Sequence, residues 1–180
     1  MSKQSRTYKI KNMKRLLLLS VMAMLTMVSF GRKHVENATI VADTIFYAQN
    51  KMNVVSSADA SYYRLLMTVG QGMNKQDVFQ DFYMDGTLKA EGGYNFVDLG
   101  NDNNTVIDGE FTTYYPNGRE KWHGQYVNGK RHGYFTMQMR DGGVAVVQYY
   151  HGINVHQYFT VTRADGSVEK HSLDELKALM

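Results

Sequence analysis

The sequence predicts a mainly β protein: an extended, curved antiparallel sheet of stacked β-hairpins, with an N-terminal β cap and a short C-terminal helix. Two observations favour this fold. The segment "HGYFTMQMRDG" at residues 132–142 returns with changes as "HQYFTVTRADG" at residues 156–166, at a constant offset along the chain. A fixed period of this size is typical of one supersecondary unit that is copied and stacked. Asn-Gly and Asp-Gly pairs, which are strong hairpin signals, also punctuate the chain in "YMDGT", "YPNGR", "VNGK", "RDGG" and "ADGS".

Glycines mark the predicted turns and set the period of the hairpins. Gly118, Gly142 and Gly166 are equally spaced, and glycine accepts the positive φ that tight turns require. The interval from Gly86 to Gly118 is longer, and the polar segment "NFVDLGNDNNTVID" supplies the extra length as a loop. Strands are expected between the turns, in "GEFTTYY", "REKWHGQY", "GYFTMQM", "VAVVQYY" and "QYFTVT".

The predicted strands carry different side chains on their two faces. Period-two geometry places the equivalent aromatic residues of successive units in one buried column, formed by Phe111, Phe135 and Phe159. Their neighbours on the same face are Thr113, Met137 and Val161. The opposite face is expected to be wetter and carries Thr112, Thr136 and Thr160.

The chain divides into four expected segments: a signal peptide (residues 1–31), an N-terminal β cap (32–78), the hairpin repeats (79–171) and a C-terminal helix (172–180). In the cap, "TIVADTIFYA" and "SYYRLLMTVG" are expected strands. In the last segment, Ser172 as N-cap and Glu175 in the third position after it predict a capping box. Leu173, Leu176 and either Leu179 or Met180 then share one side of the helix.

The N-terminal segment 1–31 has the pattern of a secretory signal. It carries six Lys or Arg and no acidic residue, and the apolar run "LLLLSVMAMLTMVSF" follows the basic start. Cleavage is expected near Gly31, and Met13 is an alternative start. Because this run is shorter than the roughly 20 apolar residues that a spanning helix needs, no stable membrane span is expected. The predicted location is therefore outside the cytoplasm, either periplasmic or secreted.

The charge of the remaining chain disfavours nucleic acid as a partner. From Arg32 onward, 14 basic residues stand against 17 acidic ones, a net charge of about −3. Nonspecific nucleic-acid binding needs a basic surface that displaces phosphate counterions. The chain has no cysteine, so a thiol nucleophile, a thiolate metal site and a lipid-accepting cysteine are all excluded.

One stretch resembles a known repeat family. "GEFTTYYPNGREKWHGQYVNGKRHGYF" resembles the bacterial variant of the MORN repeat, with looser similarity over residues 81–94 and 149–166, where Gln157 replaces an expected Gly. The residues that match the family pattern are Tyr114, Tyr115, Asn117, Gly118, Gly124, Tyr126, Asn128, Gly129, Lys130, His132 and Gly133, and the later turns add Gly142 and Gly166.

The resemblance implies a curved sheet of stacked hairpins that binds a partner and is not an enzyme. Some relatives are YwqK-type antitoxins, and eukaryotic relatives are linked to membrane lipids and scaffolding. The expected function is a noncatalytic binding or scaffold module for a protein or glycan partner. The alternatives are an antitoxin-like protein, which the export signal disfavours, and an exported hydrolase, for which no "GxSxG" or "HExxH" motif is present.

Metal and cofactor binding are not expected. His132 and His156 would lie two strands apart in one column, about 9.5 Å from each other, which is too far to share a zinc ion. The loop carboxylates Asp98, Asp102 and Asp108 offer oxygen ligands of the kind that calcium prefers, but their spacing matches no EF-hand. A solvated polar insertion is the favoured interpretation of that loop.

Tyrosine is the most suggestive residue type for recognition. The chain has 13 Tyr, and tyrosine combines apolar area with a polar tip that suits interfaces. It is also a favoured strand residue, so a structural role stays open for each of them. The residues expected to contact a partner are Tyr114, Trp122, Tyr126 and Tyr149; for Trp122, the only tryptophan, a core role is equally open.

Overall fold

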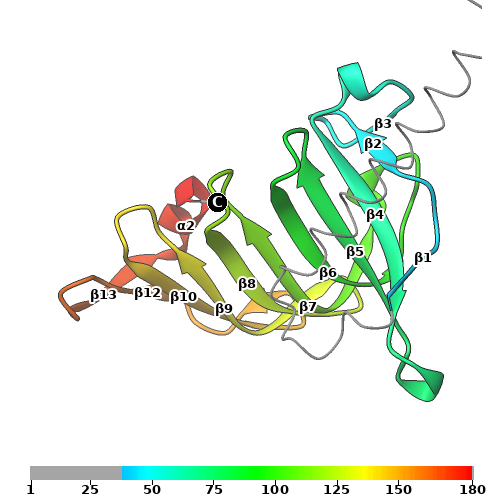
Figure 1. Ribbon diagram of the computed structural model, residues 1–180. Coiled ribbons are helices and arrows are strands. Elements are labelled where there is room, and N and C mark those ends of the chain that lie inside the picture. Colours follow the sequence, from blue (N-terminus) through cyan, green and yellow to red (C-terminus); the bar gives the residue numbers. More distant parts are fainter. Residues whose placement is uncertain (1–37, 180) are drawn as a thin grey trace, which may run out of the picture.

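The computed structural model describes residues 38–179, which form a single antiparallel sheet of 13 strands and a short C-terminal helix (Figure 1). The prediction of a mainly β chain with an antiparallel sheet and a C-terminal helix is confirmed at this level. The predicted signal peptide (1–31) and Met180 lie outside the described residues. Within the described part, no helix is long and apolar enough to cross a bilayer.

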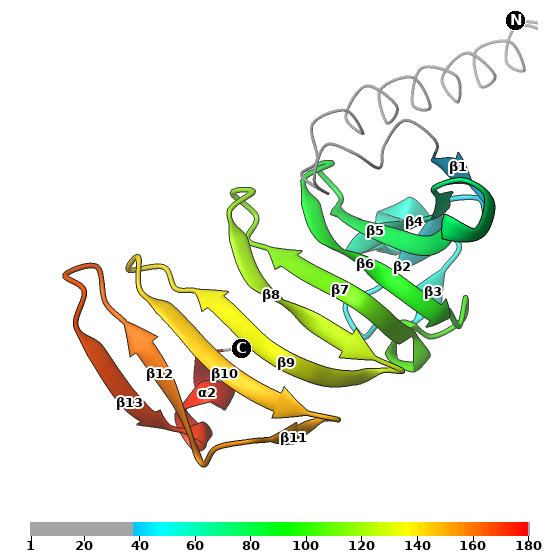
Figure 2. The ribbon, with the colours of Figure 1, turned by 90° about the horizontal axis from the view of Figure 1, so that it is seen from below.

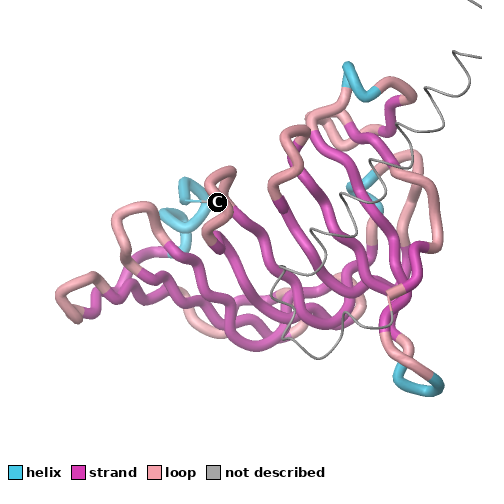
Figure 3. Tube along the Cα trace, viewed as in Figure 1, coloured by secondary structure: helices cyan, strands magenta, loops and turns pink. Residues whose placement is uncertain are grey.

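Strands that follow one another in the chain are mostly neighbours in the sheet, whose order is β13-β12-β10-β9-β8-β7-β6-β5-β4-β2-β3, with β1 paired to β4 and β11 to β10. The strands are β1 (Thr39–Ile40), β2 (Ile45–Tyr47), β3 (Asn53–Val54), β4 (Tyr62–Val69), β5 (Gln76–Tyr83), β6 (Leu88–Phe96), β7 (Val106–Tyr114), β8 (Glu120–Val127), β9 (Lys130–Gln138), β10 (Val144–Tyr150), β11 (Ile153–Asn154), β12 (Tyr158–Thr162) and β13 (Val168–Ser172). The helical elements are the 3-10 turns η2 (Ser57–Asp59), η3 (Gly72–Asn74) and η4 (Asp102–Asn104), and α2 (Leu173–Leu179). Figure 3 shows that strands, drawn in magenta, make up most of the described chain.

The sheet bends into a trough, and α2 lies on its concave side (Figures 1 and 2). Leu176 of α2 is buried in one cluster with Phe135 and Phe159, so the face that carries these rings is the concave one. The predicted capping box is confirmed, because the Ser172 backbone N–H donates to Glu175 Oε1 (3.1 Å) and the Ser172 hydroxyl accepts from the backbone N–H of the second helical residue (3.3 Å).

Four hairpins turn in the same way. In the turn that contains Gly118, the Tyr115 N–H donates to the Arg119 carbonyl and the Gly118 N–H donates back to the Tyr115 carbonyl, both at 2.8 Å. The same pair of bonds closes the turns at Gly86, Gly142 and Gly166. All four glycines have φ between +78° and +89°, a region that side chains with a Cβ rarely occupy. The predicted turns at these glycines are confirmed.

The predicted buried column of phenylalanines is confirmed at two of its three positions. Phe135 is 0% exposed and Phe159 1% exposed. Phe111 is only half-buried while Thr112 is buried, so the expectation of a buried Phe and a wetter Thr is wrong at this strand. The ring of Phe111 borders an open pocket, and the hydroxyl of Thr112 is hydrogen-bonded to His123 Nδ1 at 2.9 Å on the opposite face.

Glycine at position 124 permits close packing of an aromatic ring against the sheet. A Cβ placed on Gly124 would lie 2.3 Å from the ring of Phe135, closer than any side chain tolerates. Phe135 therefore lies directly over strand β8, and its ring contacts Trp122 (5.3 Å between centroids) and Tyr126 (5.5 Å). This close approach gives a physical reason for one glycine of the repeat pattern.

The N-terminal region differs from its prediction in two ways. The strand expected over residues 39–48 is divided into β1 and β2, which both pair with β4. The polar loop after β6 is solvated at Gly100, Asn103 and Asn104, but it is more than a solvated insertion, because Asp102 forms an ion pair with the buried Arg64 at 2.5 Å. Arg64, which is 2% exposed, also donates two hydrogen bonds to Asp81, at 2.7 and 2.8 Å. The loop is thus fixed to the sheet by buried charge.

Candidate ligand pocket on the concave face

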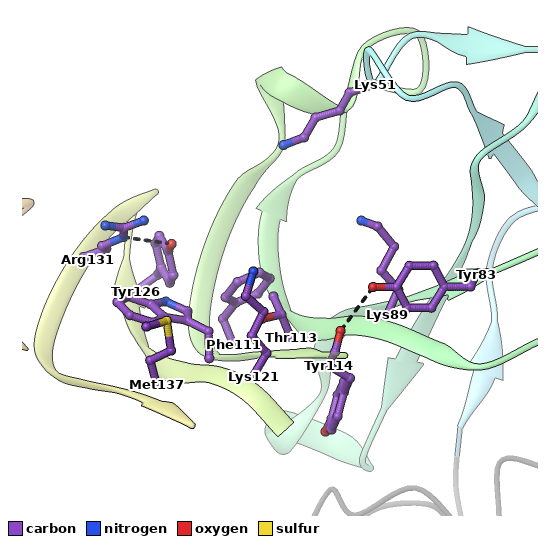
Figure 4. Close-up of a pocket in the computed structure, with 11 residues that line it drawn as sticks. Lys51, Tyr83, Lys89, Phe111, Thr113, Tyr114, Lys121, Tyr126, Arg131 and Met137 are labelled. Carbon is purple, nitrogen blue, oxygen red and sulfur yellow. Dashed lines mark hydrogen bonds between the residues drawn. The ribbon is translucent and has the colours of Figure 1, made fainter. Parts of the chain in front are cut away.

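Two hydrophobic cores fill the trough, and a pocket opens between them. The first core contains Tyr47, Tyr62 and Phe79, and the second contains Trp122 and Phe135. Phe111 of strand β7, whose ring is half-buried, packs against both cores. The pocket above this ring has a volume of about 440 Å³ (Figure 4). It lies where the regular packing of each core ends, within the size range of small-ligand sites.

Aromatic and apolar side chains form the floor of the pocket. Phe111 and Tyr126 meet edge to face with centroids 5.4 Å apart, and Trp122 and Met137 extend the floor along β8 and β9. Trp122 is only 6% exposed, and its Nε1 has no hydrogen-bond partner among the described residues. A buried N–H without a partner costs free energy, and because this atom is itself shielded from solvent, it does not face the open space of the pocket.

Four basic side chains surround this floor, and no acidic residue of the described chain lines the pocket. Lys51 comes from the turn between β2 and β3, where it adopts a positive φ of 66°. Lys89 comes from β6, Lys121 from β8 and Arg131 from β9. Figure 4 shows that the amino groups of Lys51, Lys89 and Lys121 point into the central space. The pocket is therefore a positively charged region.

Arg131 is held in place by aromatic rings. Its guanidinium carbon lies 5.4 Å from the Trp122 ring centroid and 5.2 Å from that of Tyr149. It donates hydrogen bonds to the hydroxyls of Tyr149 (3.0 Å) and Tyr126 (3.4 Å). Burial opposes the charge, but these hydrogen bonds outweigh it and raise the pKa of Arg131. The cation is thus fixed and permanently charged at the pocket wall.

Lys89 has a different environment. Its Nζ lies 4.1 Å from the centroid of the Tyr62 ring, a cation–π contact. Burial lowers the pKa of Lys89, although the negative charges of Asp81 and Asp102 act against this shift. Neither Lys89 nor Lys51 forms an ion pair with a residue in the described part of the chain. An anion in the pocket would stabilise the charged form of Lys89.

A second hollow, of about 480 Å³, lies between the sheet and α2. Arg131 lines both hollows and so stands between them. The second hollow also contains Tyr149, Asn154 and Leu176. The Nδ2 atom of Asn154 is buried and has no hydrogen-bond partner within residues 38–179. This hollow has a single basic group at its inner wall, with Lys177 and Asp174 from α2 at its rim.

The structure brings only some of the predicted contact residues together. Trp122 and Tyr126 line the first pocket, although Trp122 is buried and not an exposed aromatic residue. Tyr149 is 5% exposed and faces the second hollow. The ring of Tyr114 lies on the opposite face, where its hydroxyl donates to Glu91 Oε1 at 2.6 Å; only its carbonyl, which accepts from Tyr83 at 3.2 Å, borders the pocket.

The predicted repeat-motif residues build hairpins and do not gather at one site. The Tyr115 hydroxyl donates to the Gln138 carbonyl at 2.9 Å, tying β7 to the end of β9. The Asn117 side chain accepts from the Arg119 N–H at 3.1 Å within its turn. The β8–β9 turn and the start of β9 have positive φ, at Asn128 (50°), Gly129 (75°) and Gly133 (79°).

The candidate metal ligands are dispersed. His132 packs against His151 (4.9 Å between ring centroids), whereas His156 stacks on Tyr158. Each loop carboxylate has a different partner. Asp98 accepts a hydrogen bond from the Asn104 side chain (2.7 Å), Asp102 forms an ion pair with the buried arginine, and Asp108 accepts from the Asn128 N–H (2.7 Å). Among residues 38–179, no three His, Asp or Glu side chains are placed to hold one metal ion.

Sequence reasoning missed the basic residues of the pocket. The residues come from four separate elements and are widely spaced along the chain: Lys51, Lys89, Lys121 and Arg131. Strict alternation along each strand would place Lys89 and Lys121 on the face of the sheet opposite to that of their buried neighbours Ala90 and Trp122. That pattern indicates exposure, but not that the side chains converge on one pocket. Both lysines lie at register shifts of the sheet, where the pairing passes over Lys89 in β6 and Lys121 in β8, and these bulges let both side chains line the pocket.

The fold and pocket define a class of protein: a single curved antiparallel sheet with a cationic, aromatic-floored pocket on its concave face. Comparison of the chain with protein-family models, with curated proteins and with solved structures gives no match.

Proposed function

We propose that this chain is an exported, noncatalytic MORN-like repeat protein that binds a protein or glycan partner on the concave face of its sheet. The pocket between the two cores carries the proposal. It combines a fixed arginine with the rings of Tyr126 and Trp122 around one hollow of about 440 Å³. Aromatic and arginine side chains of this kind dominate many binding surfaces.

Two further observations support the repeat interpretation. The constant offset between the two similar segments of the sequence coincides with one complete hairpin, and the turns at Gly118, Gly142 and Gly166 share the same two hydrogen bonds. Stacked units of this type create an extended concave surface, which such proteins commonly use for binding. The pocket occupies the middle of that surface, beside the hairpin that matches the MORN pattern best.

Affinity capture from the envelope fraction of the producing cell tests this function. The full-length chain, Tyr126→Ala and Tyr134→Ala are immobilised in parallel. Tyr126 lines the pocket, whereas Tyr134 is on the opposite face of the next strand and is 66% exposed. We expect the wild type and Tyr134→Ala to retain one common protein or glycan, and Tyr126→Ala to lose it.

A folding control accompanies this comparison, because Tyr126 also packs against Phe111 and Phe135. Circular dichroism spectra and thermal midpoints show whether Tyr126→Ala keeps its sheet. Lys51→Glu changes the charge of an exposed pocket residue in a turn and serves as the second pocket variant. A partner that binds both pocket variants and the wild type equally would refute the concave face as the binding surface.

Export is tested separately. We expect the mature chain to begin near Arg32, because the basic start and apolar run of residues 1–31 have the pattern of a cleaved signal. Mass spectrometry of the native protein from each cell fraction measures its N-terminus. A chain that begins at Met1 or Met13 in the cytosol would refute export and favour the antitoxin-like alternative.

A further inference from the structure

We infer that the pocket binds an acidic oligosaccharide of the uronate type, whose sugar rings lie on the aromatic floor and whose carboxylates meet the surrounding cations. This inference rests on the proposed function and names the chemical class of its ligand. Three features of the pocket carry it: the distribution of its charges, the chemistry of its floor and the backbone pairing beneath that floor.

The charges of the pocket are spread around it. Lys51, Lys89, Lys121 and Arg131 belong to four different elements, and Figure 4 shows Lys51 and Lys89 on one side with Lys121 and Arg131 on the other. Within residues 38–179, no acidic side chain lines the space between them. The net charge of about −3 from Arg32 onward makes this basic region a local exception. A ligand with several separate single charges matches the arrangement better than one compact, multiply charged group.

A phosphate group is usually held in a different way. Phosphate sites commonly use the backbone N–H groups of a helix N-terminus or of a glycine-rich loop. Here the floor is made by β6, β7, β8 and β9, interior strands whose two edges are both paired. Apart from the register shifts in these strands, their backbone N–H groups are therefore committed to the sheet. A flat bilayer surface also cannot follow the concave side of the trough seen in Figure 2.

The same backbone pairing disfavours an extended acidic peptide. A peptide that binds along a sheet normally gains hydrogen bonds by adding a strand to a free edge. The strands that border this pocket offer no such edge, since they lie in the middle of the sheet order. Sugars instead place C–H groups over aromatic rings and hydroxyls beside side-chain donors. Phe111 and Tyr126 provide the rings, and Thr113 and Tyr83 provide hydroxyls.

Trp122 supplies a direct measurement, because it is the only tryptophan of the chain and it lines the pocket. The full-length protein is titrated with tri-galacturonate while the tryptophan emission is recorded. Matched probes are a neutral galactose trisaccharide, inorganic phosphate, tetraglutamate and a single-stranded oligonucleotide. We expect the uronate to change the emission with saturation, the neutral sugar to bind at least tenfold more weakly, and added salt to weaken uronate binding.

Two double variants separate the pocket cations from general charge. Lys51→Gln with Lys89→Gln removes two pocket charges, and Lys75→Gln with Lys130→Gln removes two exposed charges elsewhere. We expect uronate affinity to fall about tenfold in the first variant, because each partly exposed ion pair makes a modest contribution. The second variant should bind as the wild type does, and thermal midpoints confirm that both are folded.

Each other outcome overturns the inference. Equal binding of the neutral sugar, unchanged affinity in the pocket variant, tighter binding of phosphate, tetraglutamate or the oligonucleotide, or no uronate-dependent signal would each exclude an acidic oligosaccharide. Such a failure is distinguishable from failure of the proposed function. A protein or neutral glycan that is captured through Tyr126 would keep the concave face as the binding surface while refuting the uronate.

Discussion

The two halves of the sheet are stabilised by different chemistry. Within the described residues, every buried charged side chain is in β4, β5 or β6, where Arg64, Asp81 and Glu91 are each 2% exposed. The half from β7 onward buries an almost purely apolar set, with Phe135 and Phe159 at its centre. The first half fixes an irregular loop to the sheet by ion pairs, whereas the second packs apolar rings between consecutive antiparallel hairpins.

The difference follows from what each half must hold. Hairpins joined by short turns can pack ring over strand, as Phe135 does over Gly124, without any help from charge. The loop after β6 is held in another manner, because Asp102 and Thr105 both reach the guanidinium of Arg64. Buried ion pairs are poor sources of net stability but are costly to break. The first half should therefore be the more sensitive to loss of a charge.

Replacement of Arg64 gives the largest expected effect. Arg64→Met leaves the carboxylates of Asp81 and Asp102 buried without their cation, which should lower the free energy of unfolding by about 3–5 kcal/mol. Arg163→Met is the matched control in the second half, because Arg163 pairs with Asp141 and Glu169 at an exposed position. Urea denaturation measures both. A similar, small loss in the two variants would contradict the contrast between the halves.

The corresponding test in the second half removes an aromatic ring. Phe135→Ala deletes a side chain that is 0% exposed and contacts Trp122, Tyr126 and Tyr149. A loss of about 3–5 kcal/mol is expected from transfer and cavity costs. Phe111→Ala should cost less, because this ring is half-buried and faces the pocket. If Phe111→Ala proves to be the more damaging of the two in thermal denaturation, the account of two cores separated by a pocket is wrong.

The turns should behave alike in both halves. Gly86 lies in the first half and Gly142 in the second, with φ of 89° and 88° and open space around the position of a Cβ. Gly→Ala at either position forces a side chain into the left-handed region, which costs about 1–2 kcal/mol. Denaturation midpoints of the two single variants measure this cost. Clearly unequal losses would show that the two turns do not carry equivalent strain.

The sequence predicted the second half well and the first half poorly, for physical reasons. Local rules suffice where turn glycines and alternating apolar residues repeat, so Gly142, Gly166 and the column of Phe135 and Phe159 were predictable. Arg64 sits in an apolar strand sequence, and nothing local indicates that it meets carboxylates from β5 and from the loop after β6. The same holds for the pocket, because Lys89 and Lys121 lie at register shifts between strands that no local pattern announces. Phe111 departs from its column because the bend opens there.

The smallest expected effect distinguishes a necessary buried charge from a dispensable one. Glu91 accepts hydrogen bonds from Tyr114 (2.6 Å) and from Gln80 Nε2 (3.0 Å), while Gln80 Oε1 has no partner among the described residues. Glu91→Gln keeps an acceptor for Tyr114, and its new amide N–H can donate to Gln80 Oε1 after the Gln80 amide turns over. The turned Gln80 amide then leaves its Nε2 where Oε1 had no partner, so the gain comes from removal of the buried charge alone, and we expect the variant to be more stable at pH 7 by about 1 kcal/mol.

The pH dependence of that gain tests its cause. Burial raises the pKa of Glu91 above its usual value of 4.5, although the two donated hydrogen bonds oppose the shift. Because the folded carboxyl binds a proton more readily than the unfolded one, acidification from pH 7 through the raised pKa stabilises the wild type. The advantage of Glu91→Gln in urea denaturation should therefore shrink as the pH falls towards 4.5. An advantage that grows on acidification would mean that the ionised carboxylate stabilises the fold, as Asp102 does beside Arg64, where the arginine lowers the carboxyl pKa in spite of burial.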